Sequence, residues 1–250
     1  MDRFGVYAYC GYDLPADERF KKIKEAGFKK VGVWCHSDFN TYSGISEYEQ
    51  FKFVREQGLA VSYAHAPIGQ APYLSNKYYG AKDAVKAHKL YVRSAKEQGV
   101  GVVVMHLPEV TSVVIDHVAE IAAFATDLGA KVAVENLVGQ TPFDELFREV
   151  ENVYFCYDSC HALMFGDRDG EMASRYMDRL ITTHLSDGDG KSDCHYMIGD
   201  GAFDFATLAK RLRDGGYEGD FVSEAFRSAE YADISEFLST TKARLEQFFG

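Results

Sequence analysis

The chain alternates short apolar runs with longer amphipathic stretches over its whole length. Eight runs of four to six residues are mostly rich in Val, Ile, Tyr or Phe, the composition expected of buried parallel strands. Between them, apolar positions recur at helical spacing. The predicted strands are residues 5–9, 30–35, 59–64, 100–105, 131–134, 153–157, 180–183 and 220–223. The predicted helices are residues 17–26, 47–57, 81–98, 112–128, 205–213 and 234–249.

A glycine separates the end of a predicted helix from the next strand five times, at Gly27, Gly58, Gly99, Gly129 and the pair Gly215-Gly216. Glycine after the last helical residue adopts the left-handed conformation that ends a helix, so each one marks a helix-to-strand turn. The last helix carries an apolar stripe that we expect to close a barrel. Its members are Ile234, Phe237, Leu238, Leu245, Phe248 and Phe249.

Eight strands alternating with helices indicate an α/β fold, either a (β/α)8 TIM barrel or an open doubly wound sheet. An open sheet that binds a dinucleotide carries GxGxxG after its first strand, and this chain does not. Polar candidates instead follow many strands, as at the mouth of a barrel. No linker or charge block divides the chain. We therefore predict a single TIM barrel spanning residues 1–250, and expect the long loop 186–202 to be functional.

The charge and cysteine content limit the kinds of partner and compartment that we expect for this protein. The net charge of −11 opposes binding to nucleic acid, and no dense cluster of Lys and Arg offsets it. Five scattered cysteines are typical of reduced thiols rather than of a disulfide framework. The first residues lack the pattern of a signal peptide, and no apolar run is long enough to span a membrane. We expect a cytoplasmic protein without a membrane partner, and assembly into a homo-oligomer stays open.

Acidic residues and histidines recur where the predicted strands end, more often than a random distribution along the chain would place them there. Five of the eight histidines follow such runs or lie in the long loop. Ligands carried by successive strands meet at one mouth of a barrel, so the pattern predicts a shared metal site. The candidates are His65, His106, Glu135, Asp158, His161, His184, Asp193, His195 and Glu224.

Four segments carry a resemblance to a known family: 134–136 (VEN), 157–162 (YDSCHA), 184–187 (HLSD) and 195–204 (HYMIGDGAFD). They resemble the xylose isomerase-like TIM-barrel superfamily, which holds sugar and sugar-phosphate isomerases and epimerases and the endonuclease IV branch (apurinic/apyrimidinic endonuclease family 2). The resemblance implies one divalent metal, Mn²⁺, Zn²⁺, Co²⁺ or Mg²⁺, held by Glu135, Asp158, His184 and Glu224. Three carboxylates and one imidazole suit such hard or borderline cations.

The activity implied is isomerisation or epimerisation of a small sugar, sugar phosphate or polyol, by proton transfer through a metal-stabilised enediolate. Glu135 and Glu224 would be the catalytic pair, each keeping one oxygen free to remove or return a proton. His161 would contact the substrate. We expect substrate contacts also from His65, His106, Asp193, His195 and Lys191, and from Trp34 unless it belongs to the core.

Three alternatives stay open. In the endonuclease IV branch, His65, His106, Asp193 and His195 would be further ligands of a trinuclear zinc centre that cuts abasic DNA. The acidic charge and the few basic residues in the loops, chiefly Arg168, Lys191 and Arg227, favour the isomerase instead. Other metal-dependent sugar enzymes such as dehydratases are the second alternative. A sugar- or metal-binding module that has lost its chemistry is the third, and the two glutamates argue against it.

Overall fold

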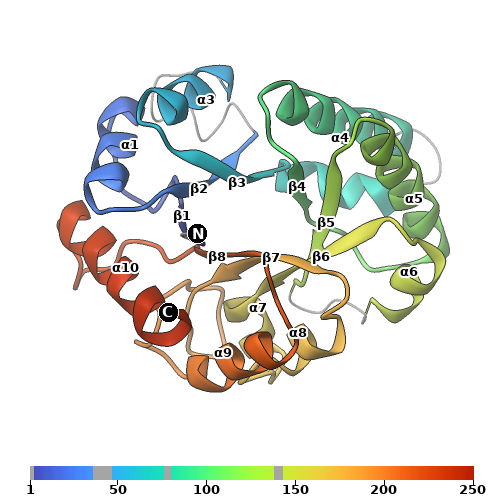
Figure 1. The fold of residues 1–250 in the computed structure, drawn as a ribbon. Helices are drawn as coiled ribbons and strands as arrows, with labels where there is room; N and C mark the ends of the chain where they lie inside the picture. The colour runs from blue at the N-terminus through green and yellow to red at the C-terminus, as the bar shows by residue number, and fades with distance from the viewer. Residues whose placement is uncertain (1–2, 36–46, 76–79, 138–142) are drawn as a thin grey trace.

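Eight parallel strands close into a barrel in chain order, because β1 pairs with both β2 and β8 (Figure 1). The computed structural model describes residues 3–35, 47–75, 80–137 and 143–250. The strands are β1 Phe4–Tyr7, β2 Lys30–Trp34, β3 Ala60–His65, β4 Val102–Met105, β5 Lys131–Glu135, β6 Val153–Asp158, β7 Leu180–Leu185 and β8 Asp220–Ser223. This confirms the TIM barrel predicted from the alternation of runs.

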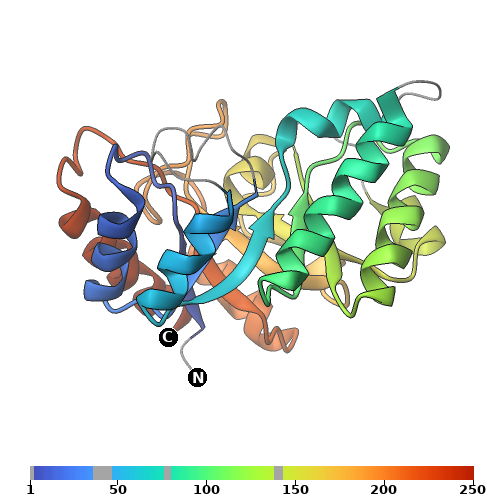
Figure 2. The ribbon, with the colours of Figure 1, turned by 90° about the horizontal axis from the view of Figure 1, so that it is seen from above.

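Helices surround the barrel on all sides (Figure 1). They are α1 Ala16–Glu25, α3 Glu47–Glu56, α4 Gly80–Glu97, α5 Ser112–Asp127, α6 Asp144–Glu149, α7 Ser159–Met164, α8 Glu171–Arg175, α9 Phe205–Asp214 and α10 Ile234–Phe249, with the 3-10 helix η1 Ile68–Ser75. Figure 2 shows the C-terminus at the lower edge of the barrel and the loop that follows β7, in orange, at the upper edge. Among the described residues, no helix combines the length and apolar character that crossing a membrane requires.

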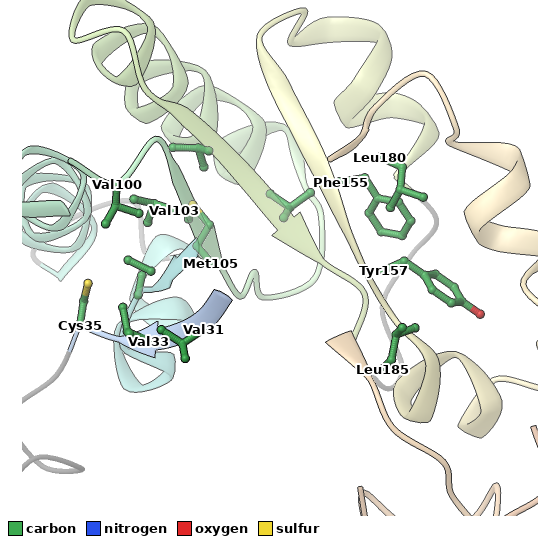
Figure 3. Packing of buried hydrophobic residues seen from close by; sticks show 14 of the residues in the cluster. Val31, Val33, Cys35, Val100, Val103, Met105, Phe155, Tyr157, Leu180 and Leu185 are labelled. Atoms are coloured by element: carbon green, nitrogen blue, oxygen red, sulfur yellow. The ribbon is translucent and has the colours of Figure 1, made fainter. Parts of the chain in front are cut away.

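Two apolar layers hold the fold together. The larger one lies between the strands and the helices, where Val31 and Val33 of β2 and Phe155 and Tyr157 of β6 point outward (Figure 3). The smaller one is a separate cluster. It contains Tyr63, Val104, Ala133, Cys156 and Val222, which alternate along their strands with members of the larger layer and therefore face the barrel interior.

The predicted turns and the last helix match the structure. At each of the five helix ends one glycine has a positive φ, from 64° at Gly58 to 88° at Gly27, and in the pair Gly215-Gly216 it is Gly216. Ile234, Phe237, Leu238 and Leu245 of α10 are buried in the larger layer, and Phe248 and Phe249 pack against it. The apolar stripe of α10 therefore covers the closing seam between β1 and β8.

The element boundaries differ from the predictions at the mouth of the barrel. The fifth, sixth and seventh strands run one or two residues further than predicted, so Glu135, Asp158 and His184 lie within strands rather than after them. The prediction also missed η1, α6, α7 and α8. The three α-helices among these have five or six residues, too few to show an amphipathic period.

Gly32 leaves room for the ring of Tyr63 inside the barrel. A Cβ at position 32 would lie 2.3 Å from Cζ of Tyr63 and 2.4 Å from its hydroxyl oxygen. Tyr63 is fully buried, so its ring has no open space to enter. We expect Gly32→Ala to lower the free energy of unfolding by about 1–3 kcal/mol, as overpacked cores do. Urea unfolding followed by circular dichroism measures this loss.

Gly101 provides the matched control. A Cβ at Gly101 would meet no atom within 4 Å, so Gly101→Ala should change the free energy of unfolding by less than about 0.5 kcal/mol. Equal stability of the two variants would contradict the close packing of Tyr63 against Gly32.

Candidate active site

The site lies at the mouth formed by the C-terminal ends of the strands. Side chains two residues apart on a strand share a face, so each inward residue of the smaller apolar layer is followed by a polar residue higher in the barrel. Tyr63 is followed by His65, Val104 by His106, Ala133 by Glu135, Cys156 by Asp158 and Val222 by Glu224. The strand period therefore gathers the acids and imidazoles above the apolar interior.

Glu135, Asp158, His184 and Glu224 form the central group. One ligand atom from each lies within 4.8 Å of the others, and all four side chains are buried. Nδ1 of His184 lies 3.1 Å from Oε2 of Glu135 and 3.0 Å from Oε2 of Glu224. Ligands that share one cation with bonds of about 2.1 Å lie roughly 3 Å apart when they are neighbours, so the spacing fits a common ion.

Buried polar atoms without partners support the same interpretation. Oδ2 of Asp158 and Nδ1 of His184 are fully buried and form no hydrogen bond with any described residue. Nδ1 of His184 is close to two carboxylates, yet none of these contacts has hydrogen-bond geometry. Such atoms cost free energy unless something binds them. The described residues therefore fit a divalent cation at the centre of the group.

The charges in this group are unequally compensated. Burial raises the pKa of Glu135, but the charges of His184 and His106 lower it, and the result lies well below the ordinary value. Burial also raises the pKa of Glu224, but the charge and close contact of His184 outweigh it, so the pKa is lowered. For Asp158, burial raises the pKa to about 6 despite the charge of His161. The positive charges near Asp158 thus do not offset the effect of its burial, and a bound cation would add to them.

His65 and His106 also approach Glu135, at the oxygen that faces His184. Their Nε2 atoms lie 3.1 Å and 3.2 Å from Oε2 of Glu135. Nδ1 of His65 lies 2.7 Å from the carbonyl oxygen of Ala66 and must carry the proton that it donates there. With Nδ1 donating to this carbonyl, Nε2 faces the carboxylate, the orientation in which a ligand histidine presents this atom to a metal.

His161, Asp193 and His195 form a third group beside the first two. Oδ1 of Asp193 lies 3.2 Å from Nε2 of His161 and 2.8 Å from Nε2 of His195. Hydrogen bonds from these two rings lower the pKa of Asp193. Nδ1 of His195 lies 2.9 Å from the hydroxyl of Ser186. The predicted residues 65, 106, 161, 193 and 195 therefore do meet at the mouth.

The buried carboxylate of Asp187 organises the loop that carries Asp193 and His195. Oδ1 accepts hydrogen bonds from the backbone N–H groups of Gly188 (2.8 Å) and Phe203 (3.0 Å), and Oδ2 accepts one from Gly199 (3.1 Å). His195 has φ 42°, a conformation that L residues adopt rarely and that the surrounding contacts must hold. The loop 186–202 is thus a fixed part of the site.

A cavity of about 430 Å³ opens above these groups. Aromatic rings line its β8–β1–β2 side, where Tyr7 lies 6.4 Å from Trp34 and 6.3 Å from Phe226 between ring centroids. Trp34 stacks on His65 with centroids 4.7 Å apart, so it forms part of the wall. The described lining residues are Tyr7, Trp34, His65, Ile68, His106, Glu135, His161, Asp193, Cys194, His195, Glu224 and Phe226.

One predicted substrate contact has no such support. Lys191 is exposed in the loop after β7 and is not among the described lining residues, so its contact with substrate stays a prediction. Sequence reasoning missed the parts played by Asn136, Ser186 and Asp187, whose side chains bond to neighbouring functional residues or to backbone. The only sequence signals for these residues were that Asn136 follows Glu135 and that Ser186 and Asp187 begin the long loop.

The comparisons with known proteins agree with this architecture. The family model described as xylose isomerase-like TIM barrel matches residues 20–241. An uncharacterised protein of Methanocaldococcus jannaschii is 24% identical and covers 98% of this chain and 92% of its own. Fructoselysine 3-epimerase of Shigella flexneri is 21% identical over 84% of this chain and 85% of its own. A structure of D-psicose 3-epimerase with D-tagatose from Clostridium cellulolyticum superposes with a TM-score of 0.81 at 16% identity, covering 99% of each chain.

Proposed function

The chain belongs to the xylose isomerase-like TIM-barrel family, and within that family we propose that it is a divalent-metal-dependent sugar epimerase or isomerase. The observation that carries the proposal is the pair of glutamates that face one imidazole. Glu135 of β5 and Glu224 after β8 both approach Nδ1 of His184. Two carboxylates on either side of a bound ketose suit removal of a proton from one face and its return to the other.

Glu224 is the residue that we propose as the base. Its Oε2 faces His184, its side chain is 10% exposed and lines the cavity, and its Oε1 forms no hydrogen bond or ion pair with the described residues. This agrees with a free oxygen on Glu224. Glu135 differs from the expectation, because Oε1 lies 3.1 Å from Nδ1 of His161 and Oε2 contacts His65, His106 and His184. We propose Glu135 as the acid. Substrate would displace His161 from Oε1 and remove one of the contacts that lower the pKa of Glu135, so that Glu135 takes up a proton from solvent and delivers it to the substrate carbon.

In the proposed reaction, Glu224 removes the proton from a carbon next to the carbonyl, and the electron pair of that bond moves into the carbonyl to give an enediolate. Delivery of a second proton from Glu135 to the opposite face gives the epimer, while Glu224 keeps the first proton until it is released to solvent; delivery of a proton to the former carbonyl carbon gives the isomer. A bound divalent cation would supply electrostatic stabilisation of the negative charge that develops on the substrate oxygens. The aromatic wall of Tyr7, Trp34 and Phe226 would pack against the apolar face of the sugar.

Relatives support a sugar as the substrate class. The curated relative named fructoselysine 3-epimerase and the structural neighbour named D-psicose 3-epimerase both carry the name of a sugar epimerase in their descriptions. We therefore expect a small-molecule sugar, sugar phosphate or polyol as the partner. A cytoplasmic location and a homo-oligomeric assembly stay predictions from the sequence.

A second candidate function has one specific observation in its favour. His65 and His106 gather around Glu135, and His161 and His195 around Asp193, so each set has nitrogens and carboxylate oxygens 2.8–3.2 Å apart. Two further zinc ions there would suit a phosphodiesterase that cuts abasic DNA. The net charge of −11 opposes it, and no Lys or Arg is among the described lining residues.

A paired assay tests the two functions against each other. The purified protein is incubated with a panel of ketoses and ketose phosphates and, separately, with a duplex that carries one abasic site, each with Mn²⁺ or Zn²⁺ supplied. We expect epimerised or isomerised sugar and an intact duplex, because the site has two carboxylates for proton transfer and no basic side chains for phosphates. Cleavage of the abasic strand without sugar turnover under either metal would overturn the proposal in favour of the phosphodiesterase.

A further inference from the structure

Asn136 follows Glu135 directly, at the point where β5 ends. Its side chain is almost fully buried, with 2% of the residue exposed. Nδ2 donates a hydrogen bond to the carbonyl oxygen of Asp158 at 2.8 Å, and Oδ1 accepts one from the backbone N–H of Asp158 at 2.8 Å. One amide side chain thus satisfies both backbone groups of the residue that provides the neighbouring candidate ligand.

This reciprocal pair extends the sheet beyond its backbone ladder. The last residues paired between β5 and β6 are Glu135 and Cys156. Beyond them, the amide of Asn136 takes the place of a backbone peptide and ties the end of β5 to that of β6. Without this pair, the backbone N–H of Asp158, which is fully buried, would lose its acceptor.

The same residue also orients the histidine of the site. The carbonyl oxygen of Asn136 lies 2.9 Å from Nδ1 of His161, which donates the hydrogen bond. Oδ1 of Asp158 caps the first turn of α7 by accepting from the backbone N–H of His161 at 2.7 Å. Asn136, Asp158 and His161 therefore form a closed ring of hydrogen bonds, and Glu135 is attached to it covalently.

We propose that Asn136 is a positioning residue that sets the separation of Glu135 and Asp158 and so tunes the affinity of the site for its cation. The inference rests on the proposed metal-dependent function. Two buried carboxylates repel each other, and the repulsion acts to separate the strand ends that carry them. The amide of Asn136 opposes that separation before the cation binds. The two carboxylates are then already in place, so cation binding costs less conformational entropy.

The chemistry of the side chain explains why an amide stands here. Only Asn and Gln offer a donor and an acceptor side by side in one planar group, which the parallel N–H and C=O of Asp158 require. Asn136→Asp keeps the shape and the acceptor. It replaces the donor with an oxygen that faces the carbonyl of Asp158 and adds a negative charge beside the carboxylates. Asn136→Ala removes both hydrogen bonds without adding a charge.

The test is a metal titration of the whole chain, with the dissociation constants for Mn²⁺ and Zn²⁺ measured by competition with a chromophoric chelator. We expect both Asn136→Asp and Asn136→Ala to bind about 10–100-fold more weakly than the wild type, the usual effect of losing an outer-shell partner. Circular dichroism establishes that each variant is folded at the titration temperature. A residue that served stability alone would lower the melting temperature and leave the affinity of the folded protein unchanged.

Asn152→Asp is the matched control. Asn152 lies just before β6, at the far end of the barrel, where its half-buried side chain donates to the hydroxyl of Thr126 at 2.9 Å. Its substitution should leave the dissociation constants unchanged. Tight binding by the wild type and equal binding by the Asn136 variants would overturn this inference alone. Binding of no divalent cation by the wild type would overturn both this inference and the proposed metal dependence.

Discussion

Glu224→Gln should reduce kcat for ketose epimerisation or isomerisation by about 10²–10⁴-fold or more, the contribution typical of a general base. Glutamine keeps the size of the side chain and one oxygen for the cation, but its amide cannot take a proton from carbon. Glu224 already lies 3.0 Å from His184 through one oxygen, so the substitution removes the proton acceptor and weakens the proposed cation site together. The measurement is incorporation of deuterium from D₂O into the sugar, followed by NMR, beside turnover itself.

Glu230→Gln is the control for this variant. Glu230 lies in the loop after β8, six positions beyond Glu224, and is exposed. Its substitution should leave deuterium incorporation at the wild-type rate. Glu224→Gln with a normal fold and wild-type incorporation would show that the base is another residue.

The fold was predictable because its signals repeat. Each strand is a short apolar run, and each of five long helices ends at a glycine whose positive φ the structure confirms. The short helices α6, α7 and α8 carry no such signal. The helix α7 begins at Ser159 because Asp158, a candidate metal ligand, also caps its N-terminus. The sequence pattern indicated the role of Asp158 as a ligand but gave no sign of its role as a helix cap.

The candidate site was predictable to the same extent. The period of two along each strand brings Glu135, Asp158, His184 and Glu224 to one point, and the structure brings their ligand atoms within 4.8 Å of one another. Their binding of a cation stays a prediction. Hydrogen bonds from a side chain to a distant backbone have no sequence period, so the contacts of Asn136 with Asp158 were not predictable. The same holds for the three hydrogen bonds that Asp187 accepts within its loop.

The three histidine and acid groups are connected through Glu135, and this explains the ambiguity between the two branches of the family. Glu135 belongs to the central group and also contacts His65 and His106. His161 contacts Glu135 through Nδ1 and Asp193 through Nε2. In an epimerase the outer imidazoles would hold substrate hydroxyls, whereas in a phosphodiesterase they would hold further ions. The number of cations that bind tightly therefore separates the two functions.

Removal of the divalent cation by a chelator should abolish turnover and lower the melting temperature by roughly 10 °C, with recovery of both when Mn²⁺ is returned. Three buried carboxylates lie together in the central group, and a cation offsets their mutual repulsion. A ligand at 1,000 times its Kd stabilises the folded state by about 4 kcal/mol, and each kcal/mol shifts the melting temperature of a chain this long by about 2–4 °C. Differential scanning calorimetry measures the shift, and elemental analysis after dialysis should find one metal per chain.

The Asp158→Asn variant makes this measurement specific to the site. The melting temperature of Asp158→Asn should respond far less to Mn²⁺, because Asp158 is buried in the central group and the amide loses its charge. Asp178→Asn should respond as the wild type does, because Asp178 is exposed and pairs with Arg179 at the other end of β7. A melting temperature and turnover unchanged by chelation would remove the metal from the mechanism. Three tightly held zinc ions per chain would instead assign the outer histidines to metal binding and favour the phosphodiesterase.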